Sequence, residues 1–354
     1  MKARAKRWLG YLGYPVAYFA LLGLFARMTF PYERVRDRLV SEFNAKQTSG
    51  GMRLEIADMS GYWLSGIEAE GVKLTRYSVS DASSSGGSAD DQKPKVTVID
   101  RMYGSVSLLK LLFGKVSGSF GAKIQSGEMD GSFASSDSEQ SLEVTFKQMG
   151  VGDIPMLSDL AGLPLKGTVN GQLEVVLPEK NPTKAEGKIE LNLEGLAAGD
   201  GKTKVLKVIA LPELKVGHMK LVATITEGRV KLDSMSAKGP DFEMAVDGSI
   251  RLREPTPTSM LDLGMRFRFM DGYKNKSDIT KGLFGSAGVP GLFEMDDKVR
   301  RSKREDGFYG WRIVGTLERP LFEPNPSGTA GGGRPATRLP PGRRVAVPGA
   351  PAAP

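Results

Sequence analysis

The sequence predicts a mainly β protein: a single N-terminal transmembrane helix followed by an antiparallel β-sheet domain with a few short helices. Three observations indicate this fold class. An uncharged apolar run fills residues 8–26, alternation of polar and apolar residues begins at residue 52 and recurs up to residue 317, and long helical periodicity is missing from that region. A period of two places successive side chains on opposite faces of a sheet.

The apolar run from Trp8 to Ala26 predicts a membrane span. As a helix it would rise about 28 Å, close to the roughly 30 Å hydrocarbon core of a bilayer. Because the basic residues precede it, the positive-inside rule predicts a cytoplasmic basic stub over residues 1–7, an anchor over 8–28, and the rest of the chain across the membrane. The anchor side chains expected to meet lipid are Trp8, Tyr11, Tyr14, Phe19, Leu22 and Phe25.

A cleaved signal peptide and a buried core helix are the alternatives to an anchor. Signal peptides usually have an apolar core of about 7–15 residues and a small-residue cleavage site. The run here is longer, and the residues that follow it, RMTFPY (27–32), lack an A-x-A pattern. We therefore favour an uncleaved anchor.

Composition excludes several classes of chemistry. The 354 residues include no cysteine, so disulfides, thiolate nucleophiles, iron–sulfur clusters and zinc–thiolate sites are excluded. The one histidine, His218, lies inside an alternating segment, and the paired carboxylates at 90–91 and 296–297 fall in loop-like segments. We expect no enzyme activity, no cofactor and no metal.

The net charge of +8 does not predict a nucleic-acid partner. Much of the excess lies near the N-terminus, in KVRRSKR (298–304) and in the tail. Nucleic-acid-binding proteins usually gather Lys and Arg on one face with aromatic platforms, and the central sequence mixes both signs of charge instead.

Residues 29–48 predict an amphipathic helix directly after the anchor. Thr29 is its expected N-cap, and Pro31 falls near the first turn, where proline is tolerated. An apolar stripe recurs at helical spacing through Tyr32, Val35, Leu39 and Phe43. Such a helix either lies at the lipid headgroups or packs on the following sheet, and we favour packing.

The segment 49–322 predicts the β-rich domain. Residues 52–59 and 66–74 form a hairpin pattern around a turn, and we expect Trp63 in that turn to pack where the hairpin meets the preceding helix. Residues 78–93 are a Ser/Gly/Asp-rich flexible loop, residues 105–113 a short helix ended by Gly114, and residues 323–354 a disordered Pro/Gly/Arg-rich tail. The remaining expected strands include 95–99, 116–124, 127–133, 142–146, 165–177, 185–196, 205–208, 214–226, 229–232, 242–252, 260–269 and 308–317.

Two of these strands carry candidate groove residues. The first alternates Leu173, Val175 and Leu177, and the second alternates Ile189, Leu191 and Leu193. Each set should lie on one face of its strand. The sequence offers few helices to cover that face, so an exposed apolar groove is one reading, and a face covered by other elements is the other.

Three segments carry a resemblance to a known family: FPYERVRDRL (30–39), MSGYWLSGIEAEGVKL (59–74) and GFYGWRIVGTLERPLFEPNP (307–326). Together with the N-terminal run they resemble the protein N component of the bacterial type II secretion system, in its delta-proteobacterial-type branch. The juxtamembrane residues that carry most of the likeness are Phe30, Pro31, Tyr32, Arg34 and Leu39.

The resemblance implies a single-pass protein of the bacterial inner membrane, with a cytoplasmic N-terminus and a periplasmic β-rich bulk. It implies a non-enzymatic accessory role in secretion, as an interaction or scaffold module that contacts other type II secretion subunits. The strands also look similar to the AsmA/TamB-like group, whose curved or rolled sheets carry an apolar groove thought to conduct lipid. That likeness implies the alternative, a module that binds or transfers phospholipid. A weaker possibility is peptidoglycan contact through the basic tail.

Overall fold

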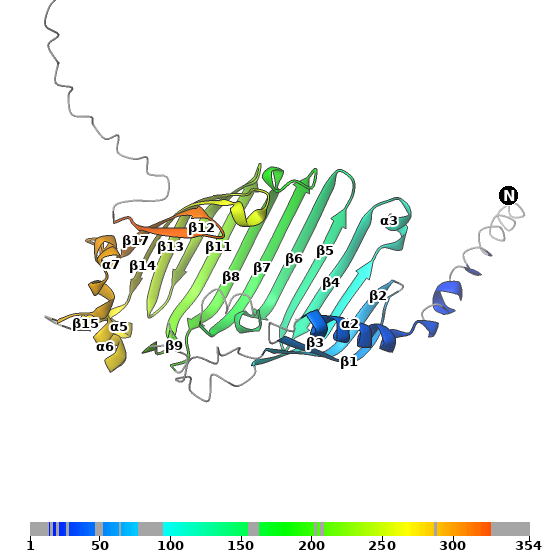
Figure 1. The fold of residues 1–354 in the computed structure, drawn as a ribbon, viewed down its shortest axis with the longest axis horizontal. Helices are drawn as coiled ribbons and strands as arrows, with labels where there is room; N and C mark the ends of the chain where they lie inside the picture. The colour runs from blue at the N-terminus through cyan, green and yellow to red at the C-terminus, as the bar shows by residue number, and fades with distance from the viewer. Residues whose placement is uncertain are drawn as a thin grey trace, which may run out of the picture.

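The computed structural model describes residues 14, 17–18, 21–25, 28–46, 52–63, 65–76, 95–154, 163–201, 204–205, 209–286 and 289–326. The protein is mainly β, as predicted, and its main feature is one 14-stranded antiparallel sheet with a few short helices. Each strand of this sheet pairs with the next main strand along the chain, so the topology is a long meander (Figure 1).

The main sheet contains, in spatial order, β1 (Met52–Tyr62), β2 (Gly66–Arg76), β3 (Lys95–Val106), β4 (Val116–Ile124), β5 (Gly127–Ser135), β6 (Glu139–Gly150), β7 (Leu165–Pro178), β8 (Glu186–Ala198), β11 (Leu214–Thr226), β12 (Arg229–Lys238), β13 (Phe242–Arg251), β14 (Met260–Phe269), β17 (Tyr309–Thr316) and β18 (Pro320–Pro324). Two small hairpins pair β9 (Lys204–Val205) with β10 (Ile209–Ala210), and β15 (Gly285–Ser286) with β16 (Val289–Pro290).

The α-helices are α2 (Tyr32–Lys46), α3 (Leu108–Leu112), α5 (Asp271–Lys274), α6 (Asp278–Phe284) and α7 (Asp297–Ser302). Single 3-10 turns occur at η2 (Val151–Asp153), η3 (Pro182–Lys184), η4 (Thr256–Thr258) and η5 (Leu292–Met295). The expected hairpin at 52–74, the short helix at 105–113 and the closing strand at 308–317 are confirmed as β1–β2, α3 and β17.

Helix α2 packs along the edge strand β1, which confirms the packing alternative for the juxtamembrane segment. The Asn44 side chain donates to the Leu54 carbonyl (3.1 Å) and accepts from the Leu54 amide (2.8 Å), so it occupies backbone groups of β1. Arg36 donates to the Ala57 carbonyl at 3.3 Å. The helix therefore covers a sheet edge that would otherwise offer backbone groups to another strand.

Two details of the N-terminal prediction are wrong. The Thr29 hydroxyl does not cap α2 but donates back to the Phe25 carbonyl at 2.8 Å. Trp63 is 75% exposed and is not buried at the junction of the hairpin with α2. The Tyr32 side chain of α2 lies against Gly61 there, since a Cβ on Gly61 would come within 2.4 Å of the Tyr32 hydroxyl oxygen.

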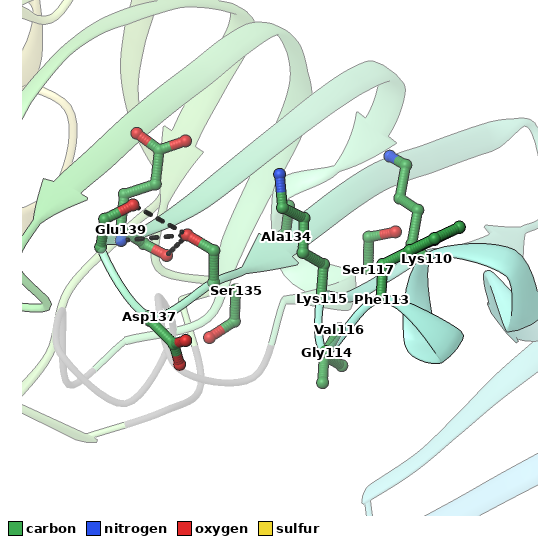
Figure 2. Close-up of a pocket in the computed structure, with 12 residues that line it drawn as sticks. Lys110, Phe113, Gly114, Lys115, Val116, Ser117, Ala134, Ser135, Asp137 and Glu139 are labelled. Carbon is green, nitrogen blue, oxygen red and sulfur yellow. Dashed lines mark hydrogen bonds between the residues drawn. The ribbon is translucent and has the colours of Figure 1, made fainter.

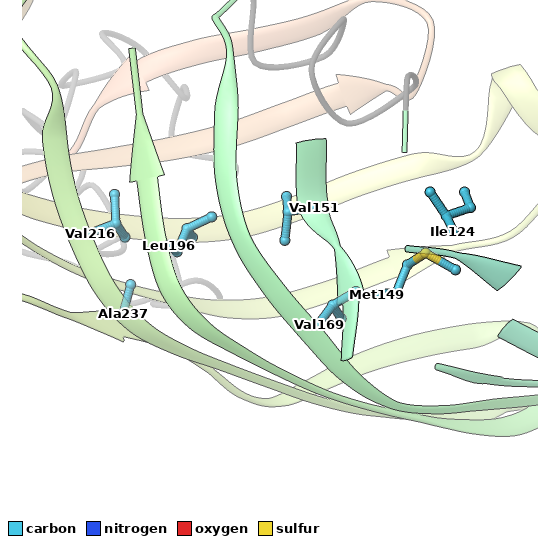
Figure 3. Close-up of a cluster of buried hydrophobic side chains, with 7 residues drawn as sticks. All are labelled: Ile124, Met149, Val151, Val169, Leu196, Val216 and Ala237. Atoms are coloured by element: carbon cyan, nitrogen blue, oxygen red, sulfur yellow. The ribbon is translucent and has the colours of Figure 1, made fainter. Parts of the chain in front are cut away.

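One end of the sheet is closed by a cluster of buried apolar side chains, which we call the core cluster: Ile124, Met149, Val151, Val169, Leu196, Val216 and Ala237. Figure 3 shows them gathered on one side of the curving strands. The register shifts at this end in β6, β7 and β11. Such bulges bend strands and increase their twist, which lets the strand ends and η2 fold over the same face.

An aromatic cap covers the same face at the C-terminal part of the sheet. Phe269 of β14 contacts Phe284 of α6, with ring centroids 4.7 Å apart, and stacks on Tyr273 of α5 at 5.9 Å. The Tyr273 hydroxyl donates to the Pro212 carbonyl at 3.0 Å, and burial raises the pKa of Tyr273 to about 12. Helices α5 and α6 are therefore fixed to the β14 end and to the start of β11.

The ordered body extends slightly beyond the predicted start of the tail at residue 323. Strand β18 runs to Pro324, and the Asn325 amide donates to the Gly310 carbonyl at 2.8 Å. The loop predicted at 78–93 and the rest of the tail lie outside the described residues.

Asn44→Ala should lower the free energy of unfolding by about 1–2 kcal/mol, because both hydrogen bonds to Leu54 are lost. Thermal or urea unfolding of the full chain measures this. Arg38→Ala is the matched control, since it breaks only a fully exposed pair with Glu42 on the same helix. An equal loss of stability in both variants would contradict the role given to Asn44.

A chain that ends at Pro326 should keep the melting temperature of the full chain, because β18 and the Asn325 hydrogen bond are retained. A chain that ends at Glu318 loses β18 and uncovers β17, and it should melt several degrees lower. Differential scanning calorimetry of the two truncations compares them directly. Equal melting temperatures would show that β18 adds nothing to the sheet.

Candidate functional site: an apolar face of the sheet

The pairing register joins the apolar sides of all the main strands into one surface. Residues directly opposite each other in an antiparallel pair lie on the same face. The six candidate groove residues obey this rule, since Leu173 pairs with Ile189 and the others follow at spacings of two. All six are half-buried. The structure therefore brings the two predicted sets together on one face, which we call the apolar face.

A central row on the apolar face crosses the whole sheet without interruption. It begins beside α2 and ends at the last strand. Its members are Gly61, Ile67, Gly104, Phe120, Gly131, Val144, Leu173, Ile189, Ala223, Leu232, Gly248, Leu263, Ile313 and Phe322.

Two flanking rows have the same character. The row toward the core cluster contains Met59, Ala69, Met102, Ala122, Met129, Phe146, Gly171, Leu191, Leu221, Met235, Val246, Met265, Trp311 and Pro324. The row toward α3 contains Val106, Gly118, Phe133, Leu142, Val175, Gly187, Ile225, Val230, Ile250, Leu261, Gly315 and Pro320. No charged, hydroxyl or amide side chain occurs in any of the three rows.

Glycines in these rows leave room for aromatic rings to lie across the neighbouring strand. A Cβ at Gly131 would come within 2.3 Å of the Phe120 ring, and a Cβ at Gly118 within 2.8 Å of the Phe133 ring. The rings therefore spread over the backbone of β5 and β4 instead of projecting from it. Here the apolar face is a smooth surface of ring and backbone atoms.

The apolar face is only partly covered by the described residues. The core cluster closes one end, the aromatic cap covers part of β13, β14 and β17, and α2 borders β1. In the described residues, no helix or second sheet packs over the middle of β4 to β8. In the central row of β4 to β8 the side chains are half-buried and Val144 is buried, whereas Leu142 in the row toward α3 is 40% exposed and Met102 on β3 is similarly exposed. A broad apolar surface that is open to solvent usually marks a binding function.

The opposite face of the sheet carries the charges. Cross-strand ion pairs on it include Arg268 with Glu243 (2.6 Å) and Arg312 with Asp262 (3.0 Å). His218 lies exposed on β11, as expected for a structural strand position. The Tyr103 hydroxyl donates to Asp130, and this bond, together with burial, raises the pKa of Tyr103. The sheet is therefore divided into one charged face and one apolar face.

Within the described segments, no group of three or more His, Asp or Glu side chains is arranged to hold a metal ion. No helix among the described residues has both the length and the apolar character to cross a bilayer. Of the predicted anchor residues, Tyr14, Leu22 and Phe25 are described and exposed, whereas Trp8, Tyr11 and Phe19 lie outside the described residues.

The juxtamembrane motif has a structural part and an exposed part. The ring of Phe30 contacts the ring of Tyr32, with centroids 4.8 Å apart, and the Pro31 carbonyl accepts from the Val35 amide in the first turn of α2. Arg34 and Leu39 are exposed. The motif thus includes residues that dock α2 on β1 and residues that point away from the sheet.

Comparisons of the chain with protein-family models, with curated proteins and with solved structures find no match.

Sequence reasoning found the six groove residues but missed most of the apolar face. The same alternation is present in all the remaining main strands. The pairing register is needed to show which of the two alternating sets of side chains in each strand lies on the apolar face. Bulges change which set this is: the left-handed Gln148 precedes Met149, and the left-handed Gly217 follows Val216. A strand-by-strand pattern cannot place such positions.

The aromatic cap contains the Glu294 carboxylate, and protonation of this carboxylate should weaken the cap. Glu294 accepts hydrogen bonds from Lys303 and from the Tyr309 hydroxyl, both at 2.7 Å, and these bonds hold its pKa below the ordinary value. A carboxylate with a lowered folded-state pKa stabilises the fold above its unfolded pKa, and that contribution disappears as the pH falls through the folded pKa.

Glu294→Gln should therefore lower the melting temperature at pH 7, and the difference from the native chain should be smaller at pH 3 than at pH 7. Thermal unfolding followed by circular dichroism at both pH values measures this. Asp278→Asn is the control, because Asp278 is fully exposed on the neighbouring helix α6. A difference between native and Glu294→Gln chains that is as large at pH 3 as at pH 7 would contradict the assigned contact.

Proposed function

We propose that this chain is a membrane-anchored, non-enzymatic module that binds lipid acyl chains along its apolar face and transfers them. The observation that carries the proposal is a set of three adjacent rows without a charged, hydroxyl or amide side chain, two of which cross the whole sheet while the third runs from β3 to β18. The AsmA/TamB-like resemblance of the strands points in the same direction.

The chemistry of the apolar face favours hydrocarbon over other ligands. Sites for drug-sized ligands and cofactors normally place a few polar groups among apolar ones to fix orientation, and protein interfaces carry about one hydrogen bond per 100–200 Å². Apart from the indole N–H of Trp311, the side chains of the three rows provide no hydrogen-bonding group. A ligand that makes no hydrogen bonds over this surface must itself be hydrocarbon there, and the acyl chains of phospholipids fit this description.

The extent of the apolar face also suits transfer along the sheet. Fourteen strands at a spacing of about 4.8 Å span roughly 60 Å in the hydrogen-bonding direction. That is longer than the roughly 40–45 Å thickness of a whole bilayer. Such a surface can shield acyl chains well beyond the headgroup layer of the membrane that supplies them.

An anchor over residues 8–28 and a place in the bacterial inner membrane, with the sheet in the periplasm, belong to the proposal. The apolar run and its basic flank support the anchor. Described side chains of this segment, among them Leu21, Leu24 and Phe25, are exposed and leave their apolar surface free for lipid. The single-pass arrangement would hold the apolar face close to its source of lipid.

The second candidate is an interaction or scaffold module of a type II secretion system. Its support is the sequence resemblance, and the residues of the motif that α2 leaves exposed, Arg34 and Leu39, are where a partner subunit would bind. Strand addition at a sheet edge is not favoured, because α2 covers backbone groups of β1.

The other edge is also poorly suited to strand addition. The Asn325 amide faces β17, so alternation turns Leu321 and Glu323 toward β17 and leaves Pro320, Phe322 and Pro324 facing outward. Proline has no amide proton, so Phe322 provides the one outward donor on β18. A scaffold role would therefore have to use side chains rather than edge pairing.

Photo-crosslinking in intact cells tests the lipid proposal. A photoreactive amino acid at Leu173 or at Leu191 should crosslink to phospholipid, because both positions lie on the apolar face. The matched controls are Gln172 and Asn192, the adjacent residues on the charged face of the same strands. Lipid is identified by mass spectrometry of the purified, crosslinked full chain.

Lipid crosslinks at 173 and 191 that are absent at 172 and 192 would support the proposal. Crosslinks to other polypeptides at 173 and 191 would favour the scaffold reading of this face. Equal lipid labelling on both faces would mean non-specific contact with the membrane, and that result would overturn the assignment.

A further inference from the structure

The loop between β3 and β4 carries an exposed apolar surface that the proposed function does not use. Helix α3 and the residue after it expose five large apolar side chains in a run interrupted only by Lys110: Leu108, Leu109, Leu111, Leu112 and Phe113. Leu112 is 81% exposed and Phe113 is 80% exposed. We call this surface, together with Trp63, the α3 tip.

Trp63 extends the α3 tip from the neighbouring hairpin. It lies in the turn between β1 and β2 and lines a pocket together with Lys110 and Ser107. The backbone holds the two parts together, because the Ser65 hydroxyl donates to the Val106 carbonyl and the Ser107 amide donates to the Ser117 carbonyl. The exposed apolar side chains therefore project from a fixed turn and a fixed helix.

The charges at the α3 tip are all positive. Between residues 101 and 127 the sequence contains no Asp or Glu, and Lys110 and Lys115 have no carboxylate partner among the described residues. Figure 2 shows their ammonium groups extending to the same side of a pocket of about 400 Å³. Asp137 and Glu139 line its opposite wall, where Ser136 hydrogen-bonds the backbone of Glu139.

We infer that the α3 tip inserts into the surface of a lipid bilayer that contains anionic headgroups. Leucine and phenylalanine side chains gain by entering the interface, tryptophan prefers that depth, and lysine attracts anionic lipid. A protein partner would have to match a small apolar tip whose own segment, residues 101–127, contains no Asp or Glu, which suits bilayer insertion better than protein docking.

The position of the α3 tip in the fold is consistent with insertion into a bilayer. Tyr32, at the start of α2, lies against Gly61, two residues before Trp63. The chain that precedes α2 therefore leaves the sheet at the corner where the tip is, and its last residues include the exposed Met28 and Phe30. The core cluster lies at the other end of the strands, so the tip and the open part of the apolar face share one end.

Because the chain has no cysteine, a single introduced cysteine can report on this contact in the full-length protein. Leu112→Cys is labelled with an environment-sensitive fluorophore, and the full chain is reconstituted into vesicles of phosphatidylcholine and phosphatidylglycerol. Lipids with a nitroxide on the acyl chain serve as quenchers. Leu292→Cys is the control, because Leu292 is 59% exposed on η5 at the core-cluster end.

The inference predicts blue-shifted emission and quenching at 112, and water-like emission without quenching at 292. Water-like emission at both positions would overturn it, and so would quenching at both, since the whole domain would then lie on the membrane. This readout does not depend on the apolar face. If position 112 is not quenched but position 173 crosslinks to lipid, the α3 tip does not insert and the proposed function of the apolar face stands. If position 112 is quenched but position 173 gives no lipid crosslink, insertion of the α3 tip stands and the proposed function does not.

Two sets of variants in the labelled Leu112→Cys chain separate the apolar and charge contributions. Leu109→Ser with Phe113→Ser should abolish quenching while the melting temperature stays unchanged, because both side chains are exposed. Lys110→Gln with Lys115→Gln should weaken docking about fivefold per lysine on anionic vesicles and leave it unchanged on pure phosphatidylcholine. Lys231→Gln with Lys238→Gln on β12 is the matched control, and an equal effect there would contradict a local contact.

Discussion

The strand register is the constraint on which the rest of this structure depends. Each main strand pairs with its neighbour along the chain, and the pairing sets Leu173 opposite Ile189 and Ile189 opposite Ala223. A slip of one residue in any strand would send its apolar side chains to the charged face. Cross-strand ion pairs such as Arg268 with Glu243 oppose such a slip from the other side of the sheet. The apolar face therefore exists because every pairing holds its register.

The sheet has two edge strands, β1 and β18, and one apolar face, and the edges are protected more completely than the face. It protects both edges, with α2 on β1 and with the outward prolines of β18. It covers the apolar face only at its borders, with the core cluster and the aromatic cap. Protection of the edges together with exposure of the face is the combination expected of a protein that binds apolar ligands and avoids pairing with other strands.

The sequence allowed the mainly β class, the first hairpin, α2, α3 and the six groove residues to be predicted, because each of these is a local pattern. The continuous apolar face could not be predicted, since bulges such as the one at Gln148 change the phase of a strand without a clear sequence signal. Trp63 was misplaced because a large aromatic residue suggests burial, whereas this one is exposed. Strand β18 was assigned in part to the tail because of its prolines, although these occupy the outward positions where no amide proton is needed.

Native mass spectrometry of the full chain isolated in mild detergent tests most directly whether the apolar face holds lipid. If the apolar face holds lipid, the native chain should carry adducts of phospholipid mass. It should lose them when Leu173→Glu and Leu191→Glu place charges in adjacent rows, and keep them when Gln172→Glu and Asn192→Asp change the opposite face of the same strands. Adducts that survive the charges on the apolar face, or a native chain that carries none, would contradict lipid binding at the apolar face.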